Sequence, residues 1–526
     1  MRKYTAILTF LAMAAGMPAF AQNPNLNPQV QVTNDYKAQL GLQGKQSVEI
    51  EVPDSLKSFR TSVDYDVIAT PYKGSYEFSP YEISIAPQKP ASDFGKFFFR
   101  GGAGYSFRPE LQAVYVPLHK AKHTLLIYQD LSGYLGRYRS LDERSPYNGF
   151  DFSENFGLEG KVFSTNYAFD YGVDYKGLLN RDFNGNSTFH QFTVKGGIKT
   201  DIDAKVLFAA NASVSHAIDT YLDQTSVRAS GYFMPIWNFP FDVRVDADVA
   251  GFFYSAVYST KFVMGISPKA LIETGPLKIE AGVRLGPARD LQWLFPDVTV
   301  RADLLDGTMQ PYAFAKGGQF AVDYADLKLA EHWFSPSYAT DLRPGLERLN
   351  AAVGMRGNFL GKLQYDVHGG YAAYAYAPLY TYYPQGGLMA YGISQDKYSN
   401  WYVDADLAWK SRRWDADAKI LYRYTSIEPN DNYLDLPQLC ASARVRRNWN
   451  SRIYAGLWCE AQTARDALNY PVKGFVNLGV DAEYKIDSML GVWAKIGNIL
   501  NQDIALSPLH IENGIYFTAG ISLDLR

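Results

Sequence analysis

The sequence predicts an all-β protein, a transmembrane antiparallel β-barrel of about 22 strands, within a range of about 14 to 22. Three observations carry this prediction. Apolar residues recur on every second position, short and long connections alternate between these runs, and no run after the N-terminus reaches the roughly 20 unbroken apolar residues of a membrane helix.

The first residues have the pattern of a secretory signal peptide. Arg2 and Lys3 precede an apolar stretch at residues 6–15, and the motif AFA ends at Ala21. The alternative is a first transmembrane helix, but a glycine and a proline interrupt the stretch before it reaches spanning length. We therefore expect cleavage after Ala21, removal of residues 1–21 and export of the mature chain.

Residues 22–95 differ in composition and residue pattern from the rest of the chain. They are rich in Asn, Pro and Gln at the start, and their short β-like runs are separated by prolines. We expect a short extended N-terminal region, periplasmic or entering the lumen, rather than a compact domain. The outer-membrane barrel is expected over residues 96–526.

Strict alternation predicts half-buried strands throughout the barrel region. In FDVRVDADV at 241–249, apolar side chains occupy the odd positions and charged side chains the even ones, and WYVDADLAWK at 401–410 repeats the pattern. A soluble β-sandwich also alternates. The membrane barrel is favoured because Trp401 and Trp409 would stand roughly 20 Å apart along the normal, near the spacing of two aromatic girdles.

The connections favour the same architecture. Tight turns are expected near 275–276, 306–307, 360–361, 411–413, 448–451 and 486–488, and longer loops at 326–347, 377–400, 426–436, 464–473 and 502–513. Short periplasmic turns and longer outer loops are typical of outer-membrane barrels, as is an even number of strands.

Ten charged residues share the face that is expected to line the lumen. They are Asp242, Arg244, Asp246, Asp248, Arg284, Asp404, Asp406, Asp415, Asp417 and Arg444. In lipid, an Arg or Lys near the midplane would cost about 2–4 kcal/mol and an Asp less, so these side chains must face water or each other. They are either a pore lining that tunes solute selectivity or a network of ion pairs that braces a wide barrel.

No motif indicates catalysis, a cofactor or a metal site. The seven His are scattered without an H-E-x-x-H pair, and neither a G-x-S-x-G motif nor a P-loop occurs. The formal net charge of −3 comes with no basic footprint for nucleic acid. We therefore expect a protein that is not an enzyme. Its expected partners are outer-membrane lipid and, within a complex, periplasmic or outer-membrane proteins.

Two cysteines are present in an exported chain, so a disulfide must be considered. Cys440 and Cys459 fall on neighbouring predicted strands. Cys440 alternates in phase with Arg444, whereas Cys459 alternates in phase with Leu457. The two thiols should point to opposite sides of the wall, and we expect both to be unpaired.

The C-terminal part of the chain carries a resemblance to TonB-dependent receptors. Their last two strands are similar to LGVWAKIGNILNQDIALSPLHIENGIYFTAGISLDLR, which includes the element NILN at Asn498–Asn501. Another strand of that family is similar to TDLRPGLERLNAAVGMRGNF, where Leu342–Pro344 form its Leu-x-Pro element. The general look is that of outer-membrane barrels from the Bacteroidota.

The resemblance implies the receptor-type barrel, whose size in that family is 22 strands. Residues 22–95 are shorter than the family's plug domain, and no TonB box is found, so we expect a barrel without a standard plug. The expected function is transport of solutes across the outer membrane, with residues 22–95 or a long loop such as 377–400 folded into the lumen. The alternative is a structural barrel subunit of a larger outer-membrane assembly, export or nutrient-capture complex.

The closing strand, GIYFTAGISLDLR, is expected to face lipid with one side only. Phe517, Ile521 and Leu525 lie on that side, and Asp524 lies on the other. The strand should pair with a first wall strand near 97–104, which leaves no open edge in lipid. On this basis Leu525→Asp is expected to block membrane assembly, and Asp524→Ala is not.

Overall fold

The computed structural model describes residues 96–525 with short gaps. The gaps are 121, 142–144, 184, 201–205, 221, 237–238, 256–259, 288–292, 306, 335–341, 386–387, 428–435, 468–469 and 513. The expected signal peptide, the N-terminal region 22–95 and Arg526 lie outside the described residues.

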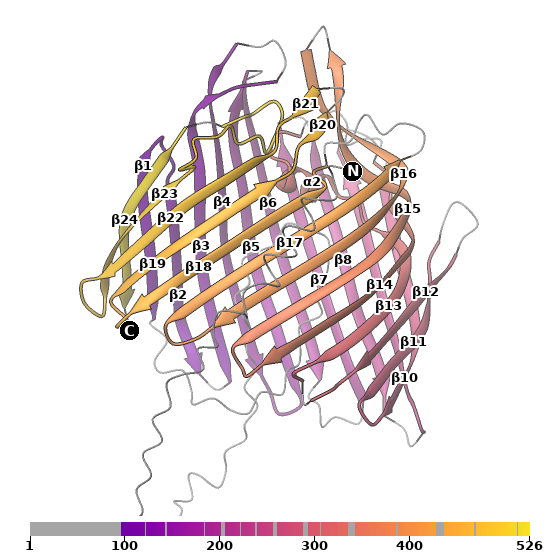
Figure 1. Cartoon of the computed structure of the whole chain (residues 1–526). Coiled ribbons are helices and arrows are strands. Elements are labelled where there is room, and N and C mark those ends of the chain that lie inside the picture. Colours follow the sequence, from indigo (N-terminus) through magenta and orange to yellow (C-terminus); the bar gives the residue numbers. More distant parts are fainter. Residues whose placement is uncertain are drawn as a thin grey trace, which may run out of the picture. The chain divides into compact units, whose positions relative to one another are not determined.

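A single sheet of 22 antiparallel strands forms the wall, which confirms the predicted fold class (Figure 1). The strands are β1 (Phe97–Tyr105), β2 (Glu110–Lys120), β3 (His123–Tyr138), β4 (Tyr147–Phe163), β5 (Tyr167–Asp182), β6 (Gly185–Thr200), β7 (Val206–Asp219), β8 (Asp223–Pro235), β9 (Asp242–Tyr254), β10 (Thr260–Thr274), β11 (Leu277–Leu285), β12 (Leu294–Ala302), β13 (Gln310–Phe320), β14 (Gly345–Phe359), β15 (Leu363–Gln385), β16 (Leu388–Lys410), β17 (Trp414–Ile427), β18 (Leu439–Trp449), β19 (Ile453–Gln462), β22 (Phe475–Lys485), β23 (Leu490–Gly497) and β24 (Tyr516–Leu525).

Two small elements lie outside the wall strands. β20 (Arg465–Ala467) and β21 (Tyr470–Val472) pair with each other, and α2 (Tyr324–Ala330) lies between β13 and β14. Among the described residues, no helix is long and apolar enough to cross a membrane.

The barrel is closed by its last strand. β24 pairs with β1 in antiparallel register, from Phe97 opposite Leu525 to Tyr105 opposite Phe517. This pairing confirms the expected role of the C-terminal strand. Closure satisfies the backbone N–H and C=O groups of both strands, which would otherwise form an open edge in an apolar medium.

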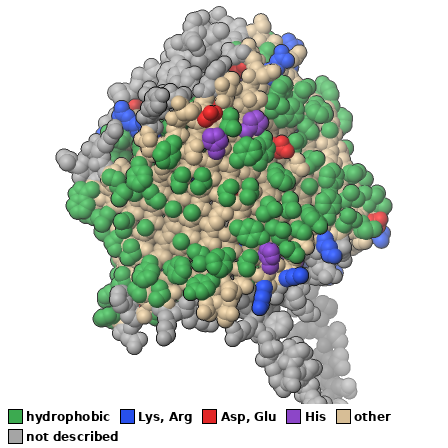
Figure 2. Space-filling model, turned by 180° about the vertical axis from the view of Figure 1, so that it is seen from behind, with side chains coloured by type: hydrophobic (Ala, Val, Ile, Leu, Met, Phe, Trp, Pro, Cys, Tyr) green, Lys and Arg blue, Asp and Glu red, His purple; other side chains and the backbone are tan. Residues whose placement is uncertain are grey.

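Alternation gives the wall an apolar outer face. Along β24, Phe517, Ile521 and Leu525 are 52%, 45% and 42% exposed, whereas Thr518 and Ser522 are buried. Hydrophobic side chains cover much of the outer wall seen from behind (Figure 2). A closed barrel with so much exposed apolar surface is built to span a membrane, because water would not tolerate it.

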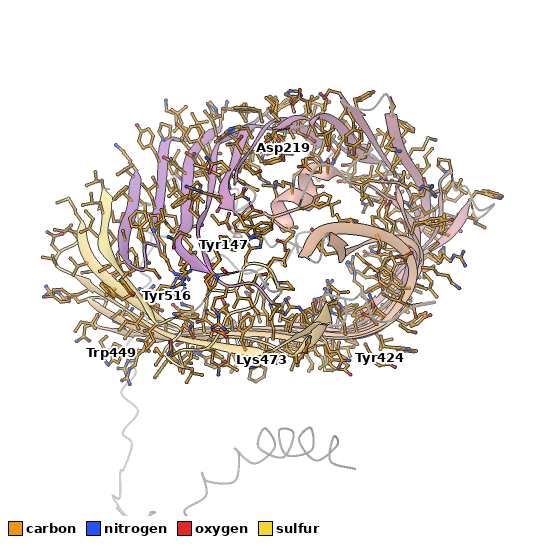
Figure 3. All side chains as sticks on the ribbon, turned by 90° about the horizontal axis from the view of Figure 1, so that it is seen from above. Tyr147, Asp219, Tyr424, Trp449, Lys473 and Tyr516 are labelled. Carbon is orange, nitrogen blue, oxygen red and sulfur yellow. The ribbon has the colours of Figure 1, made fainter. Side chains whose placement is uncertain are left out.

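Aromatic side chains on the outer face lie at both expected girdle positions of β16. Trp401 and Trp409 are 61% and 38% exposed. Viewed from above, Tyr424 and Trp449 also lie on the outer side of the ring of strands (Figure 3). These aromatic rings suit the boundary between lipid and water, where one end of a ring stays wet.

The two ends of the barrel differ in their connections. The end that holds Phe97 and Leu525 is called the lower end here, and its turns include the short connections at 275–276, 360–362 and 411–413. The opposite, upper end carries the long connections at 321–344 and 498–515.

One expected loop is a hairpin. Residues 377–400 were expected to form a long loop that can enter the lumen, and this expectation is wrong. β15 and β16 continue through them in register to Gln385 opposite Leu388. The reason is that this segment is rich in Tyr and other residues of high β-propensity, so the strands extend rather than end.

The cysteine prediction is confirmed. Cys440 on β18 lies opposite Gln462, and Cys459 on β19 lies opposite Ala443, so the two residues fall at positions of opposite parity, and both are free thiols. Alkylation of the purified protein without reductant is expected to label both cysteines in mass spectra. A peptide cross-linked through Cys440 and Cys459 would contradict the register.

Candidate functional site

A long upper connection folds into the barrel. It joins β13 to β14 and contains α2, and residues 321–334 are called the crossing loop here. The view from above shows α2 inside the ring of strands, with Asp219 pointing toward it (Figure 3). Asp323 begins the helix as its N-cap, since its side chain accepts a hydrogen bond from the backbone N–H of Ala325 at 2.7 Å.

The crossing loop packs an apolar surface against the barrel wall. Tyr324, Ala325 and Phe334 are fully buried, and they share one core with Phe189 of β6 and Phe252 of β9. Burying each large side chain contributes about 1.5–3 kcal/mol. Apolar packing therefore holds the loop against this part of the wall.

A buried carboxylate adds directional contacts. Asp323 accepts hydrogen bonds from Gln224 Nε2 at 2.5 Å, Ser226 Oγ at 2.9 Å and Arg228 Nη2 at 2.7 Å, all from β8. Arg228 also lies 2.6 Å from Asp326. Burial raises the pKa of the Asp323 carboxyl, and the Arg228 guanidinium acts in the opposite direction. Asp323 with these three partners is called the Asp323 hub.

Further contacts tie the crossing loop to strands on two parts of the wall. The Tyr324 hydroxyl donates to the Asp219 carboxylate of β7. His332 Nδ1 lies 2.8 Å from an Asp151 carboxylate oxygen of β4, and Asn180 Nδ2 of β5 donates to the His332 carbonyl at 2.7 Å. The loop therefore leaves β13 and reaches β4, β5, β7 and β8, so it crosses the upper lumen.

The second long upper connection begins at the NILN element. Asn498 is fully buried, and its side chain donates to the Gln502 carbonyl at 2.7 Å and to the Gly514 carbonyl at 3.1 Å. Asn498 and Asn501 have φ of 50° and 51°, a left-handed conformation that Asn tolerates better than most residues. The two asparagines thus close the base of the loop, which gives a physical reason for this element.

Ion pairs organise several of the ten charged residues predicted from the sequence. These pairs are Arg244–Asp246 at 2.7 Å, Arg284–Asp248 at 2.7 Å, Arg444–Asp481 at 3.2 Å, Asp406–Lys419 at 3.4 Å, and Lys269 with both Asp246 at 3.0 Å and Asp297 at 2.8 Å. Such pairing fits a wall braced by salt bridges. The assignment of these residues to the lumen stays a prediction.

The remaining predicted residues are placed by strand register. Asp404 lies opposite His368, Asp415 opposite Arg446, Asp417 opposite Arg444 and Asp242 opposite Leu271. Three of the four acids therefore face a side chain that carries or can carry positive charge. Opposite charges directly across a strand pair contribute about 0.2–1 kcal/mol each.

Sequence analysis missed the crossing loop and the Asp323 hub. The only local signal was Asp323 ahead of the short helical run YADLKLA, with Asp326 three residues later. Arg228 gives no comparable signal, because its distance of 95 residues from Asp323 in the chain hides the contact.

Comparisons with known proteins address the fold. No protein-family model matches the sequence, and no curated protein matches it significantly. Among solved structures, the copper transporter OprC matches with 12% identity and a TM-score of 0.58 over 82% of this chain and 81% of that chain. The FrpB iron transporter from Neisseria meningitidis, in its apoprotein form, matches with 10% identity and a TM-score of 0.60 over 82% and 81%.

A third match is the siderophore receptor PirA from Acinetobacter baumannii, with 9% identity and a TM-score of 0.58 over 81% of this chain and 79% of that chain. At such low identity these likenesses concern the fold. They show that this chain has the 22-stranded barrel fold of TonB-dependent receptors.

Proposed function

We propose that this protein is an integral outer-membrane barrel that carries solutes across the outer membrane. The crossing loop is the observation that carries the proposal. A 22-stranded barrel is too wide to be filled by its own wall side chains, so its path must be controlled by something inside it. The crossing loop lies there, anchored at the Asp323 hub and at Asp151.

The similar solved structures support this choice of function. Two of them are described as transporters, one for copper and one for iron, and a third as a siderophore receptor. In our proposal the ten predicted charged residues line the path on the lumen side of the wall. Their ion pairs brace the wall, and a passing solute meets a surface of mixed sign.

The proposal also assigns roles to the N-terminal residues, which precede the barrel. Residues 1–21 direct export, with cleavage after Ala21. Residues 22–95 serve as a periplasmic or lumen-entering extension in place of a standard plug. They are also the segment best suited to meet periplasmic protein partners.

Ion conductance of the purified barrel in planar bilayers tests the transport proposal. We expect measurable conductance, and a higher conductance when residues 321–344 are replaced by a short Gly/Ser linker, because the crossing loop no longer narrows the path. Forms with and without residues 22–95 should be compared. A matched control shortens only the tip of the β15–β16 hairpin, beyond the paired residues Tyr383 and Ala390. It keeps Tyr380 and Ile393, which contact the crossing loop or its core, and it should leave conductance unchanged.

The absence of conductance in all of these forms would contradict transport. It would favour the alternative, a structural barrel subunit of a larger outer-membrane assembly, export or nutrient-capture complex. Affinity purification of the native protein then supplies the second measurement, since that alternative requires a stoichiometric partner.

A further inference from the structure

The upper end of the barrel contains a small apolar socket. Val472 and Leu509 are at most 1% exposed, and they form a cluster with Ala505 and Ile511 against which Leu141 packs. His510 lies between Leu509 and Ile511 in the chain, and the Tyr138 ring meets the His510 ring edge-on, with centroids 5.8 Å apart at 84°. The socket is defined as Tyr138, Leu141, Val472, Leu509 and His510.

Contacts that do not involve the crossing loop hold the socket together. The backbones of Arg139 and Ile511 exchange two hydrogen bonds, of 3.0 and 2.8 Å. Leu141 N donates to the Pro508 carbonyl at 3.0 Å, and the Tyr147 hydroxyl donates to the Leu509 carbonyl at 3.2 Å. These bonds tie the ends of β3 and β4 to the connection at 498–515.

The β20–β21 hairpin supports the socket from another side. The Arg465 guanidinium donates to the carbonyls of Ala505 and Leu506, both at 2.9 Å. Arg108 adds an ion pair with Glu512 at 2.5 Å. Wall strands and upper connections make these contacts, so none of them depends on a residue of the crossing loop.

One residue of the crossing loop enters the socket. The Trp333 ring stacks on the His510 ring with centroids 3.6 Å apart and an interplanar angle of 9°. The Tyr138 ring meets Trp333 edge-on, with centroids 5.6 Å apart at 81°. Trp333 also packs against the apolar cluster of the socket. Stacked and edge-on aromatic pairs contribute about 0.5–1.5 kcal/mol each beyond burial.

We propose that the socket is a binding site for a planar aromatic group of about the size of an indole, which Trp333 occupies as an internal ligand. A solute that carries such a ring would replace Trp333 and loosen the crossing loop. The residues of the socket favour planar aromatic ligands. The His510 ring can stack on such a ligand, the Tyr138 ring can meet it edge-on, and the apolar cluster can contact the rest of its surface.

Competition sets the concentration at which an external ring can act. Trp333 lies between His332, which contacts Asp151, and the fully buried Phe334. It therefore faces the socket at an effective concentration of at least the order of millimolar that a short flexible linker gives. An external ring must overcome this competitor, and it binds only the form in which Trp333 has left. Such differential affinity is what allows a ligand to shift a conformational equilibrium.

Binding of N-acetyl-tryptophanamide to the purified full chain tests the socket. We expect Trp333→Ala to bind the probe at least tenfold more tightly than the unmodified protein, as measured by calorimetry or equilibrium dialysis in detergent. Adding His510→Ala to Trp333→Ala should remove the gain, because the stacking face is lost. Trp293→Ala is the matched control, since it deletes an indole that is 62% exposed in another upper connection.

The same variants test the effect on the crossing loop, and this part rests on the proposed transport function. Millimolar probe should raise the conductance of the unmodified barrel. The conductance of the Trp333→Ala variant should already be higher without the probe, and the probe should not change it. Should Trp333→Ala not fold, Trp333→Leu serves the same comparison, because it keeps apolar contact without a stacking face.

The possible failures are distinguishable. A folded Trp333→Ala that binds the probe no more tightly than the unmodified protein overturns the socket. Tighter binding with unchanged conductance overturns the coupling to the crossing loop. If no form of the barrel conducts ions, the transport proposal is contradicted. The binding measurement still tests whether the socket binds an aromatic ring.

Discussion

Replacing Arg228 by Met is expected to release the crossing loop from β8. The change leaves the Asp323 carboxylate, whose side chain is 1% exposed, without the guanidinium 2.7 Å away. Removing one partner of a buried pair costs about 3–5 kcal/mol, and we expect the low end because the Arg228 side chain is 40% exposed. A cost of about 3 kcal/mol corresponds to roughly a hundredfold more frequent opening.

Hydrogen exchange of the crossing-loop amides, followed by mass spectrometry in detergent, measures this opening. Arg301→Met is the matched control: the Arg301 side chain is 38% exposed and lies 3.6 Å from Glu280 in a loose pair, which is worth about 1 kcal/mol or less. Exchange in the loop should stay unchanged in the control. Equal exchange in both variants would show that the Asp323 hub does not hold the loop.

A double variant tests whether the unpaired charge of Asp323 causes the loss of protection. Asp323→Asn in the Arg228→Met background removes the unpaired buried charge, so part of the lost protection should return. Gln224 and Ser226 remain in reach of the new amide. Asn caps helices about as well as Asp, so the cap of α2 should survive this change. Further loss of protection would mean that the hydrogen bonds to the carboxylate from Gln224 and Ser226 stabilise the loop by more than the unpaired charge costs.

Replacing Ile521 by Arg is expected to impair membrane assembly of the barrel. Ile521 is 45% exposed on the outer face near the middle of β24, where an Arg costs about 2–4 kcal/mol in lipid. Leu525→Asp should act in the same direction with a smaller effect than the sequence alone suggested. Leu525 lies at the lower end of the strand, and the penalty falls toward the membrane interface.

Heat-modifiable migration in gels measures the folded fraction of each variant. Asp524→Ala is the control on the opposite side of the same strand, and it should assemble normally. Normal folding of Ile521→Arg together with failure of Asp524→Ala would reverse the assignment of faces. The order Ile521→Arg, Leu525→Asp, Asp524→Ala is therefore the expected order of decreasing damage.

Alternation predicted the wall of the barrel correctly because lipid imposes it. Every second side chain of a barrel strand faces lipid and must be apolar, so the sequence of each strand shows a period of two. The phase of Cys440 and Cys459 and the exposed face of β24 follow from this local rule. The pairing of β24 with β1 follows instead from closure, which leaves no open strand edge in lipid. A prediction of about 22 strands followed from counting the same pattern.

The sequence by itself determined which residues form strands and which side of each strand is apolar. Only the tertiary structure decided that 377–400 is a hairpin, that residues 321–334 cross the lumen, and that Trp333 meets His510. The physical reason is that lipid contacts one side of every strand and so imposes a period of two on its sequence, whereas no such constraint acts on the connections. Their positions depend on single buried contacts between segments far apart in the chain, such as Asp323 with Arg228, and no local pattern records those contacts.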